Sequence, residues 1–117
     1  FVRHYAGRIL NIHPALLPAY PGLDTHQRVL DAGDQWHGST VHIVTEELDA
    51  GPLIMQGRLP IRAGETAAEL AARVQALEHQ IYPEVAGLFA SGKLSANEQG
   101  VFLDGERLAQ PISREFT

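Results

Sequence analysis

Two neighbouring segments decide the fold: LIMQGRLPI at residues 53–61 and TAAELAARVQALEHQI at residues 66–81. In the first segment one face is apolar and the other carries polar residues, which predicts a strand. In the second, apolar residues recur at helical spacing, which predicts a helix with one buried stripe. These apolar positions are Leu70, Val74, Leu77 and Ile81. Thr66 and Glu69 have the spacing of a capping box, so the helix is expected to begin there.

The long helix contains Pro83, which is a break in an otherwise regular pattern. A proline ring clashes with the preceding turn and removes a backbone donor, so a kink or interruption is expected at this point. The helical pattern resumes through Leu88 and Phe89, and Gly92 is the expected stop.

Shorter elements are expected elsewhere in the chain. They are a strand at 8–12, a helix at about 25–33, a strand at 37–45, a small hairpin at 101–108 and frayed residues at 110–117. Thr25 is the expected cap of the shorter helix and Gly33 its end. Asp104 and Gly105 are the expected turn of the hairpin.

Composition excludes several classes of protein. The 117 residues carry a net charge of -5, and the nine basic residues are scattered, so neither a nucleic-acid duplex nor a membrane surface is the expected partner. No apolar run approaches the roughly 20 residues of a membrane span. The absence of Cys excludes disulfides, thiolate metal sites and a Cys nucleophile, and fits a reducing, cytoplasmic location.

The opening of the chain, Phe1 to Gly7, has the pattern of the last turn of a helix that ends at Gly7. We therefore expect the chain to be the carboxyl-terminal part of a longer protein. The alternative is a short protein with a trimmed end.

Asn11 and His13 stand at the carboxyl end of the first expected strand, where alternation places them on one face. Ligands of open α/β sheets bind outside the carboxyl ends of strands. An amide donor and an imidazole there suit acyl transfer, in which a carbonyl oxygen becomes negative. Asp49 precedes a Gly-Pro turn and is the candidate carboxylate for orienting His13. The alternatives are that His13 is structural and that Asp49 caps its own turn.

A metal site is the alternative use of the six histidines, which stand at positions 4, 13, 26, 37, 42 and 79. His37 and His42 are five residues apart on one expected strand and so face opposite sides. No His-Glu-x-x-His or Cys/His spacing occurs, so no metal is expected. Neither a Gly-rich phosphate loop nor a serine in a nucleophile elbow is present.

The runs NIHPALLP at 11–18 and VHIVTEELDAGP at 41–52 resemble the two signature motifs of the folate-dependent formyltransferases. The runs PAYPG at 18–22 and RVQALEHQIYP at 73–83 resemble the members that formylate glycinamide ribonucleotide. Methionyl-tRNA formyltransferases typically continue with Arg-Gly-Ala-Ala-Pro after the loop, and this chain does not. The resemblance implies the carboxyl-terminal half of a Rossmann-like, doubly wound α/β fold, ending in a long helix and a small hairpin.

The resemblance also implies which partners this chain meets. Residues 1–117 would be the carboxyl-terminal portion of the catalytic domain, and the amino-terminal half with its phosphate-binding loop would be a partner from the same protein. Without that half, self-association of the fragment is expected. The co-substrate would be 10-formyltetrahydrofolate, whose formyl group passes to the amine of glycinamide ribonucleotide in purine biosynthesis.

Residue roles follow from the resemblance as well. Asn11, His13 and Asp49 would be catalytic. The folate pocket would be formed by His42, Thr45, Glu46, Glu47 and Leu48. The nucleotide would be bound by Pro14, Gln75 and Glu78, although on spacing alone Gln75 and Glu78 also fit exposed helix positions. A formyltetrahydrofolate deformylase, which is a hydrolase, and a non-catalytic interaction fragment remain the alternatives.

Overall fold

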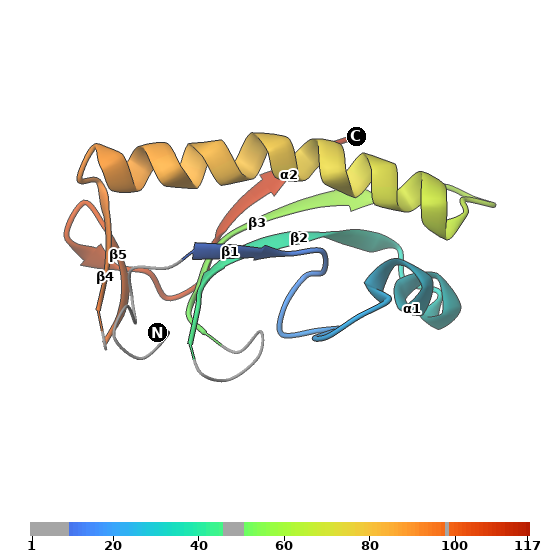
Figure 1. Cartoon of the computed structure of the whole chain (residues 1–117), viewed down its shortest axis with the longest axis horizontal. Coiled ribbons are helices and arrows are strands. Elements are labelled where there is room, and N and C mark those ends of the chain that lie inside the picture. The colour runs from blue at the N-terminus through green and yellow to red at the C-terminus, as the bar shows by residue number, and fades with distance from the viewer. Residues whose placement is uncertain (1–9, 46–50, 98) are drawn as a thin grey trace.

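The computed structural model describes residues 10–45, 51–97 and 99–117. The expected helix turn ending at Gly7 lies outside these residues. The elements in chain order are β1 (Leu10–His13), α1 (Thr25–Ala32), β2 (Trp36–Ile43), β3 (Leu53–Pro60), α2 (Ala67–Ala90), β4 (Leu94–Asn97), β5 (Gly100–Leu103), β6 (Glu106–Arg107) and β7 (Ile112–Glu115). Figure 1 shows α2 running along one face of the main sheet, with α1 near one end and the β4–β5 strands near the other.

The main sheet has the strand order β1-β2-β3-β7, in which the first two pairings are antiparallel and β3 pairs with β7 in parallel. A second, antiparallel sheet has the order β4-β5-β6. The expected α/β class is therefore confirmed. The strands expected at 37–45 and 53–61 are confirmed within two residues of their observed ends.

The core lies between α2 and the main sheet. All four residues of the expected apolar stripe on α2 are at most 2% exposed, as are Val41 and Ile43 of β2 and Ile54 and Met55 of β3. Gly57 of β3 lets the helix approach closely, because a Cβ there would lie 3.0 Å from Leu77 and 3.1 Å from Ile81. In the described part of the chain, neither helix combines the length and the apolar character needed to cross a membrane.

The capping box of α2 is confirmed. The Thr66 hydroxyl accepts from the Glu69 amide at 3.1 Å, and the Glu69 carboxylate accepts from the Thr66 amide at 3.0 Å. The expected interruption at Pro83 is wrong, since α2 is helical from Ala67 to Ala90. Pro83 is exposed, and the neighbouring turns are held by buried Ile81 and Val85 on the opposite side of the helix.

The start of α1 also differs from the expectation. Its N-cap is Asp24, in the left-handed region at φ 57°, and this residue makes no side-chain capping bond. Thr25 is instead the first helical residue, and its buried hydroxyl donates to the Pro14 carbonyl. Thr25 therefore bonds to a distant carbonyl instead of capping the amides of its own helix. The expected end at Gly33 is confirmed, with φ 73°.

The carboxyl-terminal region contains more regular structure than expected. The turn at Asp104 and Gly105 is confirmed, and both residues have positive φ. The added strand β4 pairs with β5. The expectation of frayed residues at 110–117 is wrong, because β7 pairs with β3 and the Phe116 side chain packs against the core. Polar side chains dominate β7, so its stabilising contacts are long-range and leave no local pattern.

Candidate active site

Asn11 and His13 share one face of β1, as expected. In the antiparallel register Asn11 lies opposite His42, and His13 lies opposite Thr40. Directly opposite residues in a sheet project to the same side. This face therefore carries one amide, two imidazoles and a hydroxyl within two neighbouring strands. We call it the catalytic face because Asn11 and His13 are the residues expected to be catalytic.

His13 has a defined proton position. Its ring is 6% exposed, and Nε2 lies 2.8 Å from the carbonyl oxygen of Tyr20. A carbonyl only accepts hydrogen bonds, so Nε2 carries the proton and donates it. His13 therefore presents an N–H donor on the catalytic face, directed at the backbone of the following loop.

That loop is fixed to the catalytic face by two polar side chains of the sheet. The Thr40 hydroxyl accepts from the Leu17 amide at 3.1 Å and donates to the Ala15 carbonyl at 2.7 Å. From β3, the Gln56 amide donates to the Leu17 carbonyl at 2.7 Å. These bonds position the segment that leads to Tyr20, and so they also position the acceptor of the His13 proton.

A pocket of about 530 Å³ opens on the other face of β1. Its lining residues are Ile12, Gln75, Glu78, His79, Tyr82 and Pro83. Ile12 stands between Asn11 and His13 in sequence and therefore faces the opposite side of the strand. The half-buried Glu78 is the acidic group of the pocket, so an amine or a sugar hydroxyl is a chemically suitable ligand.

Ser39 lies between the pocket and β1. Its hydroxyl is fully buried and lies 2.6 Å from Glu78 Oε2 and 2.7 Å from the His13 carbonyl oxygen. No sequence pattern links Ser39 to Glu78, which is 39 residues away. Tyr20, Thr40 and Gln56 likewise carry no motif that predicts their contacts, because each contact joins separate elements.

The remaining expected residues have varied positions. Pro14 is half-buried and is not among the residues that line the pocket. Its carbonyl accepts a hydrogen bond from the Thr25 hydroxyl. His42 is buried, and its Nδ1 donates to the Ile43 carbonyl at 3.2 Å. Thr45 is half-buried at the end of the segment that follows β2. The other expected residues, Glu46, Glu47, Leu48 and Asp49, lie outside the described residues.

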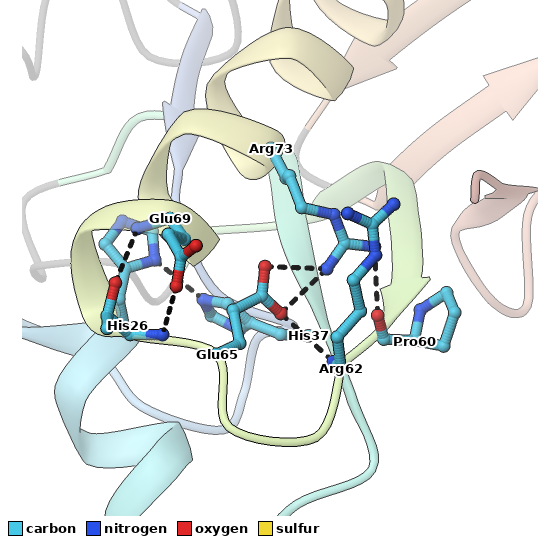
Figure 2. A network of polar contacts seen from close by, with 8 residues as sticks. His26, His37, Pro60, Arg62, Glu65, Glu69 and Arg73 are labelled. Carbon is cyan, nitrogen blue, oxygen red and sulfur yellow. Dashed lines mark hydrogen bonds and ion pairs between the residues drawn. The ribbon is translucent and has the colours of Figure 1, made fainter.

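Two further histidines form a pair beside the site. His26 Nδ1 and His37 Nε2 are 3.0 Å apart, and Figure 2 shows the two rings directed toward one another. Burial, and then the neighbouring His26, lower the pKa of His37 to about 4. Burial also lowers the pKa of His26, against the attraction of Glu78. Both rings are therefore neutral at pH 7, and one donates to the other.

An ion-pair network holds the chain that leads into α2 (Figure 2). Arg73 donates to both oxygens of Glu65, at 2.8 and 2.9 Å, and to the Pro60 carbonyl at 3.1 Å. Burial raises the pKa of Glu65, but the Arg62 amide and the Arg73 guanidinium outweigh it and lower the pKa below its ordinary value. The Arg73–Glu65 pair thus orients the helix that carries Glu78.

Among the described residues, no group of three or more His, Cys, Asp or Glu side chains is arranged to hold a metal ion. The chemistry available on the described residues is hydrogen-bond donation from Asn11 and His13 and acceptance by Glu78. These are the groups that an acyl transfer to an amine uses.

The profile of the formyl transferase family matches residues 1–86. A phosphoribosylglycinamide formyltransferase of Escherichia coli K12 is 56% identical over 108 residues, which cover 92% of this chain and 51% of that relative. The solved structure of a phosphoribosylglycinamide formyltransferase from Coxiella burnetii is 54% identical, with a TM-score of 0.91 over 97% of this chain and 54% of the other. The chain thus spans about half the length of the curated bacterial relatives it matches.

A formyltetrahydrofolate deformylase structure from Pseudomonas syringae is more distant. It is 24% identical, with a TM-score of 0.81 over 87% of this chain and 34% of that protein. At this identity the likeness shows a shared fold and carries no argument about the reaction.

Proposed function

This chain belongs to the formyl transferase family, and on that premise we propose that residues 1–117 are the carboxyl-terminal portion of the catalytic domain of a phosphoribosylglycinamide formyltransferase. The complete protein would transfer a formyl group from 10-formyltetrahydrofolate to the amine of glycinamide ribonucleotide, in purine biosynthesis in the cytoplasm. The amino-terminal half would complete the domain and hold the substrate phosphate. An isolated fragment would then be inactive and prone to self-association.

One observation carries the proposal: the acidic pocket and the catalytic face meet at β1. Ile12 lines the pocket, while its neighbours Asn11 and His13 project to the other side. β1 is the edge strand of the described main sheet, so a nucleotide held at Glu78 would reach around this edge to place its amine beside Asn11 and His13. The amine must lie on the side of these donors, because its nitrogen and the formyl oxygen become bonded to the same carbon.

The chain's own residues supply the electrostatic part of the reaction. As the amine nitrogen bonds to the formyl carbon, negative charge develops on the formyl oxygen. Asn11 would donate its amide N–H to this oxygen, and His13 would donate from Nε2. The Nε2 proton is directed at Tyr20 in the structure, so the loop carrying Tyr20 would have to release it when the substrates bind.

The proposed step is completed by the breaking of one bond and the transfer of one proton. The bond between the formyl carbon and the folate N10 breaks, and one proton passes from the attacking amine to that nitrogen. Asp49 would keep His13 charged and help a water molecule to relay this proton. No covalent bond to the protein is required.

The binding roles are proposed from the same geometry. Glu78 and Gln75 would contact the glycinamide end of the nucleotide, with Pro14 nearby. The folate would supply the formyl group, and His42, Thr45 and the segment 46–48 would surround its pterin. Of these, His42 has the most direct support, because it lies opposite Asn11 on the catalytic face.

The test is an assay of the full-length protein with both substrates. We expect formylation of glycinamide ribonucleotide that depends on 10-formyltetrahydrofolate. Formate release without the nucleotide, at a comparable rate, would instead indicate the deformylase. If His13→Ala leaves the rate unchanged in a folded protein, residues 1–117 are a non-catalytic part of the protein and the catalytic groups lie in another segment.

A further inference from the structure

Ser39 is a fully buried serine with two strong acceptors within reach and no place in the reaction above. We propose that Ser39 is a positioning residue that orients the Glu78 carboxylate for the amine substrate. This inference rests on the proposed function of Glu78 and extends it to a residue that neither motif includes.

The first argument is a count of protons. A serine hydroxyl has one proton, and neither the His13 carbonyl nor a carboxylate donates one in return. Oε2 of Glu78 is at 2.6 Å and the carbonyl at 2.7 Å, so the two acceptors compete. The charged acceptor forms the stronger bond, so the proton belongs to Glu78.

The second argument is the effect of a substrate donor. A carboxylate has about four acceptor sites, so an amine or a sugar hydroxyl can donate to Glu78 while Ser39 keeps its own bond to Oε2. Ser39 thus holds Glu78 in one orientation both before and after the substrate binds. This effect does not require Ser39 to touch the substrate.

The third argument is that the fold brings these groups together at one point of close packing. Ser39 of β2 is paired with Gly57 of β3, where the missing Cβ allows α2 to approach. Leu77 is the helix residue that a Cβ at this position would meet at 3.0 Å, and Glu78 follows it in sequence. The close approach of α2 to the sheet therefore lets the short side chain of Ser39 reach the Glu78 carboxylate.

The test uses steady-state kinetics of the full-length protein. Ser39→Ala is expected to raise the KM for glycinamide ribonucleotide about tenfold, the scale of one hydrogen bond to a charged group. The KM for 10-formyltetrahydrofolate is expected to stay within about twofold, because that substrate does not meet Glu78. Ser39→Thr keeps the hydroxyl and is expected to restore most of the loss. Ser95→Ala, at an exposed serine of β4, is the matched control.

A double-mutant cycle with Glu78→Ala decides whether Ser39 acts through Glu78. In the Glu78→Ala background, Ser39→Ala is expected to add less than about twofold to the KM for the nucleotide. Independent, multiplying effects would overturn the proposal, as would equal increases in both KM values. If Ser39→Ala does not fold, Ser39→Cys keeps a side chain with one donor, slightly larger and weaker than the hydroxyl, and answers the same question. Turnover by the unaltered protein tests the proposed function, whereas only the ratios between variants test Ser39.

Discussion

Acidification is expected to destabilise this protein through one buried imidazole. His37 is 1% exposed, and its pKa of about 4 lies below the ordinary 6.5. Between pH 6.5 and pH 4 the His37 ring is protonated in the unfolded chain but stays neutral in the folded protein. The free energy of unfolding therefore falls as the pH falls. At 1.36 kcal/mol per pKa unit the full loss is about 3 kcal/mol, and about 2 kcal/mol of it occurs between pH 7 and pH 5.

The assay is urea unfolding of the full-length protein at pH 7 and pH 5. Carboxylates also titrate in acid, so the measured quantity is the difference in pH dependence between the unaltered protein and His37→Gln. The variant should lose about 2 kcal/mol less on acidification. His79→Gln, at an exposed histidine, is the control and should keep the full dependence. Equal pH dependence in His37→Gln and the unaltered protein would refute the reasoning.

Three further predictions concern packing, capping and catalysis. Gly57→Ala should lower the free energy of unfolding by about 1–3 kcal/mol, since the added Cβ would meet Leu77; urea unfolding at pH 7 measures this loss, and an unchanged midpoint would contradict it. Thr66→Ala should cost about 1 kcal/mol by removing the bond to the Glu69 amide, with Thr66→Ser as the control that retains it. His13→Ala should slow formyl transfer at least about a hundredfold in a protein that circular dichroism shows to be folded, and a rate near that of the unaltered protein would argue against a catalytic imidazole.

Elements with a strong local pattern were predictable from the sequence. The capping box and apolar stripe of α2 are properties of neighbouring residues, and the structure agrees with them. The strand β7 was not predictable, because it is held by its pairing with β3 and by the packing of Phe116, which follows it, against the core. The continuity of α2 at Pro83 was also missed, since it depends on packing of the opposite side of the helix.

The candidate site divides in the same way. The shared face of Asn11 and His13 follows from strand alternation, which needs no knowledge of the rest of the fold. The Tyr20 carbonyl, the Gln56 amide and the Ser39 hydroxyl act on residues from other elements, and ordinary polar residues in strands and loops give no sign of such contacts. Sequence reasoning therefore identified the residues with recognisable chemistry and missed those that orient them.

The alternation of side chains along β1 limits how this region can change during evolution. One short strand presents Ile12 to the pocket and Asn11 and His13 to the opposite side. Gaining or losing a single amino acid between these positions would swap the two sides, turning an aliphatic side chain to the catalytic face and a polar side chain to the pocket. Length here is thus as constrained as identity, and insertions should accumulate in the surrounding loops.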